Sequence, residues 1–344
     1  MTRRIALIAV VVLILPWATL QADNVSPYKI DVTQEWHMVF GGQDIQLPLA
    51  IHSSKATDAR LGWSIAVGDR TIARGESALS LTDGKSTLTI PIKLPRSDKD
   101  VALAVRVLIQ LLDNEARLAQ TEMPLWIVSE NPFLDRHDWL ERTKISLFDP
   151  VGETSSAFED AHIPHERLLN VDAISRIERG VLIVGEGTSF EEFSVLRSMI
   201  WEVAARGTAV LLLAPKDGSV PLRDPSGSID ASQLHFRRAD VLADLDKRFD
   251  WRAWSSGDPV IRSFRFMAVG DEQVASVENG SREWPWVRID LPKPERTIIA
   301  CGFPIVTQWK TGPMPRHLLR RLLEVVAEDL DSNHETDNSK ETGT

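Results

Sequence analysis

The chain has a single cysteine, Cys301, among 344 residues, and its formal net charge at neutral pH is -10. One cysteine excludes an internal disulfide bond, so burial of apolar side chains must supply the stability of the fold. A strongly negative surface repels phosphate backbones, so nucleic acid is not expected as a partner. Hydrophobic residues make up 43% of the chain, which is enough for substantial cores, and the length suggests two domains.

The chain also lacks a nucleophile where α/β enzymes place one. Residues 180–188 predict a strand, a turn and the start of a helix, yet no Cys or Ser stands in a nucleophile turn at the end of a predicted strand. Cys301 follows a strand, but the residue before Pro304 disfavours a helix there, so Cys301 is expected to be a small buried side chain. These absences favour a protein that binds or scaffolds over a catalyst.

The N-terminus has the order of a secretory signal. Arg3 and Arg4 form a short basic region, residues 5–15 are apolar, and Ala22 suits the last residue before cleavage. We therefore expect a signal peptide over 1–22 and an exported protein, periplasmic or extracellular. An apolar run of this length is short for a membrane helix. An uncleaved anchor is the alternative, and it would be the only expected contact with a membrane.

Residues 27–128 are expected to form a β-sandwich of the broad immunoglobulin-like class. Apolar residues alternate with polar ones in several runs, most clearly from Val101 to Leu111. Glycine, aspartate and asparagine mark turns between these runs, such as Gly41-Gly42 and Asp83-Gly84. Residues 129–143 are expected to be a linker that carries at most a short helical turn.

Residues 144–330 are expected to form a flavodoxin-like α/β domain, with a doubly wound parallel sheet. Apolar strands are predicted over 144–149, 181–184, 209–213 and 297–300. Ser189 and Glu192 have the spacing of a capping box that opens a helix, and Gly207 ends it. Strands that alternate with helices favour a parallel sheet covered on both faces. Pro315 opens a final helix, and the acidic residues 331–344 are expected to be a disordered tail.

Four segments carry a family resemblance: 145–150, 181–186, 207–213, and 298–301 with the leucine-rich helix that follows. On these segments, residues 144 to 328 resemble a class I glutamine amidotransferase-like domain, in the non-catalytic form found in secreted bacterial glycosidase-like proteins. In such proteins an immunoglobulin-like sandwich often precedes this domain. An active member has a cysteine on a tight turn and a histidine that activates it. The corresponding turn here, residues 214–218, has no thiol or hydroxyl, so the resemblance does not imply catalysis.

The carboxyl ends of the strands are where a ligand of an open α/β sheet would bind. Those ends are expected to gather Asp149, Glu153, Glu186, Lys216, Asp217 and Cys301. Several carboxylates and one lysine could bind a polyol or a cation, or they could be solvated loop residues. Trp251 and Trp254 could stack on a sugar ring, or they could cover the sheet beneath long loops. No cofactor is expected, and His162 and His165 are not expected to bind a metal, because Pro164 separates them.

Two function classes follow. The favoured one is a secreted, non-catalytic binding or scaffolding protein, with a protein or a carbohydrate as its partner; assembly into an oligomer is compatible with it. The alternative is a hydrolase of glycans or small amides that uses carboxylates such as Asp149 and Glu186. Glycoside hydrolysis needs two carboxyl groups about 5 to 10 Å apart across a cleft. The geometry of the carboxylates therefore separates the two classes.

Overall fold

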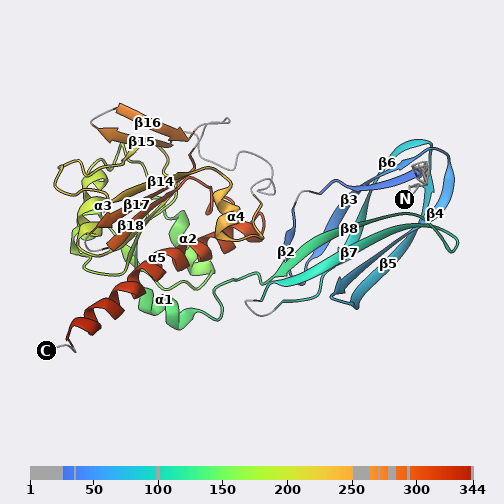
Figure 1. The fold of residues 1–344 in the computed structure, drawn as a ribbon, viewed down its shortest axis with the longest axis horizontal. Helices are drawn as coiled ribbons and strands as arrows, with labels where there is room; N and C mark the ends of the chain where they lie inside the picture. Colours follow the sequence, from blue (N-terminus) through green and yellow to red (C-terminus); the bar gives the residue numbers. More distant parts are fainter. Residues whose placement is uncertain are drawn as a thin grey trace, which may run out of the picture.

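The computed structural model describes residues 26–34, 36–97, 101–250, 264–269, 272–277, 284–292 and 295–341. The predicted signal peptide over 1–22, and also Trp251 and Trp254, lie outside the described residues. Figure 1 shows strands without helices at one end of the molecule and a part with both helices and strands at the other. We call them the strand-only part (28–128) and the α/β part (137–341). No helix among the described residues is long and apolar enough to cross a bilayer.

The strand-only part contains two sheets. Its strands are β1 (Tyr28–Val32), β2 (Met38–Phe40), β3 (Asp44–Ser53), β4 (Thr57–Val67), β5 (Arg70–Leu81), β6 (Gly84–Lys93), β7 (Leu103–Asp113) and β8 (Ala116–Val128). One sheet has the order β1-β3-β6 and the other β2-β8-β7-β4-β5. All pairs are antiparallel except β2 with β8, which is parallel.

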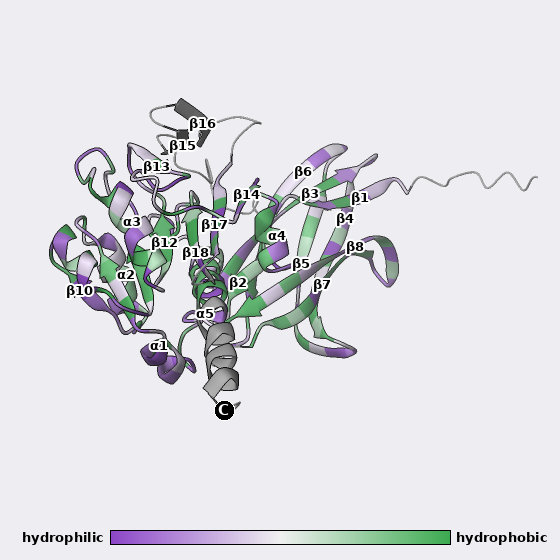
Figure 2. Cartoon of the chain, turned by 60° about the vertical axis from the view of Figure 1, so that its left-hand side comes forward, coloured by the Kyte–Doolittle hydropathy of each residue, from purple (hydrophilic) through white to green (hydrophobic). Residues whose placement is uncertain are grey.

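The two sheets of the strand-only part share one hydrophobic core. Apolar and polar residues alternate along the strands, visible as bands of colour in Figure 2. In β7 this alternation buries Val105, Val107, Ile109 and Leu111 and leaves their neighbours more exposed, because successive side chains of a strand point to opposite faces. The same cluster includes Ile51 of the smaller sheet.

The α/β part begins with helix α1. Its elements are α1 (His137–Thr143), β9 (Ile145–Phe148), α2 (Glu153–Asp160), β10 (Glu166–Leu168), the 3-10 helix η1 (Val171–Arg176), β11 (Val181–Val184), α3 (Leu196–Ala205), β12 (Ala209–Leu213), β13 (Ser219–Pro221), β14 (Gln233–Arg237), α4 (Val241–Leu245), β15 (Phe264–Val269), β16 (Glu272–Val277), β17 (Trp286–Pro292), β18 (Glu295–Cys301) and α5 (Pro313–Glu341). Every residue of β11 and β12 is buried, as expected for strands covered on both faces.

The predicted fold class is wrong. The seven-stranded sheet, β10-β9-β11-β12-β18-β17-β14, is mixed: its first five strands are parallel, but β17 pairs antiparallel with both of its neighbours, β18 and β14. Strands β13, β15 and β16 form a separate three-stranded sheet. The strand-only part, with unequal sheets and a parallel edge pair, is not clearly an immunoglobulin-like sandwich. The physical reason is that periodicity predicts strands, whereas pairing depends on contacts between distant segments.

Two helix predictions also need correction. The backbone N–H of Glu192 does donate to the hydroxyl of Ser189, at 3.0 Å, but the regular helix α3 begins only at Leu196. Helix α5 runs to Glu341, so the predicted tail over 331–344 is helical for most of its length. The tail has neither proline nor a glycine before Gly343, and its acidic and polar residues permit a helix once a long amphipathic segment has nucleated it.

Helix α5 also joins the two parts, because its first turns pack against β2. The guanidinium of Arg316 lies 5.0 Å from the ring centroid of Phe40 in β2 and 5.4 Å from that of Trp309. Its Nη1 donates to the carbonyl oxygen of Glu130, in the segment that follows β8, at 2.7 Å. One side chain of α5 therefore contacts the strand-only part, the segment that follows β8 and the segment that precedes α5.

Candidate functional site

Asp149, at the end of β9, is buried and serves the helix that follows it. Its Oδ2 accepts a hydrogen bond of 2.8 Å from the backbone N–H of Ser155, in the first turn of α2. It therefore satisfies one of the four N–H groups that a helix leaves unpaired at its start. A Cβ atom on Gly185 would lie 2.7 Å from Oδ1 of Asp149, so this close approach requires glycine. Glu153 lies in the same turn but is exposed.

Glu186, after β11, is buried beneath the connection between β18 and α5. Its Oε2 accepts from the backbone N–H of Val306 at 2.6 Å, and its Oε1 accepts from the N–H and the hydroxyl of Thr307 at 3.0 and 2.5 Å. Its own N–H donates to Thr154 Oγ1 at 2.9 Å. Burial raises the pKa of Glu186, and the hydrogen bonds from Thr307 and Val306 offset part of that rise.

Asp217, after β12, accepts hydrogen bonds from the loop that follows β11. Its Oδ1 accepts from the hydroxyl of Ser189 and from the backbone N–H of Glu191. Lys216 beside it is exposed, and its backbone N–H donates to the carbonyl oxygen of Thr188 at 3.0 Å. These contacts connect two neighbouring strand ends, so the role that the structure gives Asp217 is to hold the loop after β11.

Cys301, the last residue of β18, is fully buried. Burial raises the pKa of its thiol to about 12, and the nearby charge of Glu186 acts in the same direction. A nucleophilic cysteine needs the opposite, a lowered pKa and access to solvent. The prediction of a small buried side chain is confirmed.

The acidic groups at the predicted ligand-binding edge therefore make hydrogen bonds within the protein. The structure places Asp149, Glu186 and Asp217 after three neighbouring strands, as the sequence predicts. Each of the three, however, accepts at least one hydrogen bond from the protein's own N–H or O–H groups, although Oδ1 of Asp149 is buried without a hydrogen-bond partner among the described residues. The two histidines are also engaged locally: a ring nitrogen of His162 lies 3.1 Å from the carbonyl oxygen of Glu159, and one of His165 lies 2.9 Å from that of Ile163. Among the described residues, no three His, Cys, Asp or Glu side chains are grouped as metal ligands.

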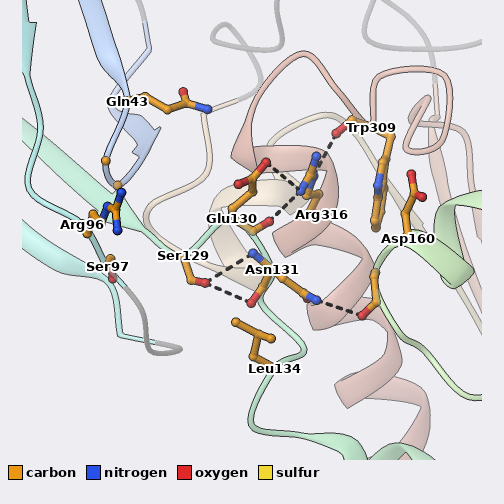
Figure 3. A pocket seen from close by; sticks show the side chains of 13 residues that line it. Gln43, Arg96, Ser97, Ser129, Glu130, Asn131, Leu134, Asp160, Trp309 and Arg316 are labelled. Carbon is orange, nitrogen blue, oxygen red and sulfur yellow. Dashed lines mark hydrogen bonds and ion pairs between the residues drawn. The ribbon is translucent and has the colours of Figure 1, made fainter.

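A large open cavity lies elsewhere, between the strand-only part and the α/β part (Figure 3). Its volume is about 710 Å³. One wall comes from the turn at 41–43 and from residues 96–97; the other comes from residues 129–131, Leu134, the end of α2, Trp309 and Arg316. We call it the junction cavity.

Part of the lining of the junction cavity is held rigidly by internal hydrogen bonds. The Nδ2 of Asn131 donates to the carbonyl oxygen of Ala161 at 2.9 Å, and its Oδ1 accepts from the N–H of Phe133 at 2.9 Å. The Nε of Arg316 donates to the carbonyl oxygen of Trp309 at 3.0 Å. Burial lowers the pKa of Arg316, while the charges of Glu130 and Asp160 raise it.

Other polar groups of the junction cavity are open to a ligand. Within the part of the chain that the structure describes, the side chains of Gln43, Arg96 and Asp160 are exposed and make no hydrogen bond or ion pair. Figure 3 shows Arg96 and Asp160 on opposite sides of the cavity, with Arg316 between them. The sequence gives little sign of this site, because distant segments build it; its only signals are the Gly41-Gly42 turn and the linker near 130.

Comparisons with known proteins give no family for the chain. No family model and no curated protein matches it. Among solved structures, the sporulation control protein Spo0M from Bacillus subtilis is similar over 40% of this chain and 56% of its own, with 17% identity and a TM-score of 0.25. A beta-glucosidase from Listeria innocua is similar over 30% of this chain and 16% of its own, with 12% identity and a TM-score of 0.23. At these scores neither likeness supports a function, and the amidotransferase-like resemblance stays a prediction.

Proposed function

We propose that this chain is an exported, non-catalytic binding protein that holds a polar ligand in the junction cavity. The observation that carries the proposal is a contrast between two sites. At the sheet edge each of the three carboxylates accepts at least one hydrogen bond from the protein itself, whereas in the junction cavity the side chains of Gln43, Arg96 and Asp160 are exposed and make no hydrogen bond or ion pair among the described residues. Export is supported by the basic and apolar N-terminal segment alone.

The size and build of the junction cavity suit a ligand. Its volume of about 710 Å³ falls within the range of roughly 300 to 1,000 Å³ that is usual for small-molecule sites. Binding sites often lie between two parts of a chain, where a few polar groups set specificity. Asn131 and Arg316 are held by several contacts, so part of the lining is ordered before any ligand arrives.

The cavity favours recognition by hydrogen bonds and charge over stacking. Trp309, the one aromatic residue among the described residues that line the cavity, is buried, and Arg316 lies over its ring. A sugar ring needs an open indole face to stack on. A saccharide ligand would therefore have to be held through its hydroxyl groups.

The hydrolase alternative has less support. A hydrolase that used Asp149 and Glu186 would need both carboxylates free across a cleft. Both are buried, and Glu186 accepts three hydrogen bonds from residues 306 and 307. Moving them to a substrate would break the contacts that hold α2 and the connection to α5.

A pair of tryptophan substitutions tests the proposal. Leu134 lines the junction cavity and is 52% exposed, so Leu134→Trp would fill part of the space without disturbing a core. Leu169, which is 85% exposed and does not line the cavity, provides the matched control Leu169→Trp. Thermal shift with a panel of oligosaccharides and short peptides is expected to give stabilising ligands for the natural chain and the control, but not for Leu134→Trp. Ligands that stabilise all three proteins equally would place the site elsewhere.

A further inference from the structure

We propose that the ligand of the junction cavity is a short peptide with free ends, its carboxylate at Arg96 and its ammonium group at Asp160. The inference rests on the proposed function and specifies the ligand. It follows from the opposite charges of the two walls: the strand-only part contributes Arg96, and the end of α2 contributes Asp160.

On the positive wall of the cavity, the backbone at Arg96 is held in place and the guanidinium group is exposed. The backbone beside Arg96 packs tightly on the 41–42 turn: the N–H of Gly42 donates to the carbonyl oxygen of Pro95 at 2.9 Å. A Cβ atom on Gly41 would lie 2.5 Å from the backbone nitrogen of Ser97, so the two segments touch. Arg96 itself is exposed and makes no hydrogen bond or ion pair among the described residues. A guanidinium held at its base offers parallel N–H donors that match a carboxylate.

On the negative wall of the cavity, the carboxylate of Asp160 lies at the C-terminal end of a helix, which is an unfavourable place for a negative charge. Asp160 is the last residue of α2, where the helix dipole is already negative and a cation is preferred. The last turn of α2 contains no basic residue, and Asp160 makes no ion pair within the described residues; the charge of Arg316 acts on it only from beyond ion-pair distance. An ammonium group bound there would interact favourably with both the carboxylate and the helix end.

In the middle of the junction cavity, the charged and polar groups of Arg316 and Asn131 have partners within the protein. Arg316 Nη1 lies 4.0 Å from the carboxylate of Glu130 and donates to its backbone carbonyl. The polar groups of Asn131 are also satisfied. A ligand with charged ends and an uncharged middle is complementary to this order of charges.

The cavity also limits the length of the peptide. A sphere of about 710 Å³ is roughly 11 Å across, and an extended chain covers about 3.4 Å per residue, so about three residues fit. A neutral trisaccharide of similar size would leave both Arg96 and Asp160 without a charged partner. A simple anion would be attracted by Arg96 and repelled by Asp160.

Calorimetric titration of the full chain with tri-alanine tests the inference, with N-acetylated and C-amidated tri-alanine as matched probes. Blocking either end is expected to weaken binding by about tenfold to a hundredfold, because a charge-assisted hydrogen bond is lost. In Arg96→Gln the free and amidated peptides should bind equally, and in Asp160→Asn the free and acetylated peptides should. The exposed residues Arg70 and Asp83 give the controls Arg70→Gln and Asp83→Asn, which should behave as the natural chain.

The outcomes separate this inference from the proposed function. Equal binding of free and blocked peptides, or no peptide binding, would overturn the inference. If the neutral trisaccharide maltotriose then bound and Leu134→Trp abolished its binding, the cavity would still be a ligand site and the proposed function would stand. If neither tri-alanine nor maltotriose bound, and the wider panel gave no ligand sensitive to Leu134→Trp, both proposals would fall.

Discussion

Thr307 donates both its backbone N–H and its hydroxyl to the same carboxylate oxygen of Glu186, at 3.0 and 2.5 Å. The two residues lie on segments far apart in the chain. Their contact holds the connection between β18 and α5 over the end of β11. This pair shows most clearly why an acidic residue at the carboxyl edge of the sheet serves structure here.

Thr307→Val is expected to lower the free energy of unfolding by about 1 to 2 kcal/mol, because it removes a partly buried hydrogen bond to a carboxylate. Thr307→Ser keeps the hydroxyl and should lower the free energy of unfolding by less than Thr307→Val does. Thr311→Val provides a control, since the hydroxyl of Thr311 donates to the carbonyl oxygen of Gln308 in an exposed hydrogen bond. Urea unfolding measures all three. A Thr307→Val protein as stable as the natural chain would contradict the role assigned to the contact.

Glu186 should make the free energy of unfolding depend on pH. Its pKa is raised in the folded state, chiefly by burial, so the folded protein binds this proton more tightly than the unfolded chain does. Its contribution to stability is therefore present in full below the unfolded pKa of about 4.5 and is lost as pH rises through the folded pKa. The difference in unfolding free energy between the natural chain and Glu186→Gln should fall as pH rises from the unfolded pKa to the folded pKa. A difference that rises with pH would show that the hydrogen bonds outweigh burial.

Cys301 should be inert in the folded protein. With a pKa of about 12, roughly one thiol in ten thousand is ionised at pH 8, and the side chain is fully buried. Labelling by a thiol reagent such as Ellman's reagent should be at least a hundredfold slower than in the urea-unfolded chain. Rapid labelling of the folded protein would reopen the possibility of a cysteine nucleophile.

Arg316→Met should loosen the junction between the two parts. It keeps most of the apolar stem but removes the hydrogen bonds to Glu130 and Trp309 and the cation stacked between Phe40 and Trp309. We expect a loss of about 2 kcal/mol in unfolding free energy and a larger radius of gyration in small-angle scattering. Arg70→Met, at an exposed position on β5, should change neither. An unchanged scattering curve for Arg316→Met would contradict this role.

Local patterns predicted the buried strands well and their arrangement poorly. The predictions for β11 and β12 are confirmed, because a short, wholly apolar run bounded by glycine or threonine has few other solutions. Strand β17 was missed, although buried residues alternate along it from Val287 to Leu291. It pairs antiparallel with β18 after a two-residue connection, and that pairing makes the sheet mixed.

The candidate site could not be predicted from local sequence patterns either, because its groups come from distant segments. The sequence identified acidic residues at strand ends, but it could not reveal which donors would reach them: the partner of Glu186 is about 120 residues away. The junction cavity depends on contacts between a turn in the strand-only part, the end of α2 and the start of α5. None of these segments has a motif of its own, so only the folded arrangement shows the opposite charges of Arg96 and Asp160.

A crystal structure of the chain grown with tri-alanine would show whether the junction cavity binds a peptide. We expect density for the peptide in the junction cavity, with its carboxylate at Arg96 and its ammonium group at Asp160. Peptide density beside Asp149, Glu186 or Asp217 at the carboxyl edge of the sheet would contradict it, and so would an empty junction cavity at a saturating peptide concentration.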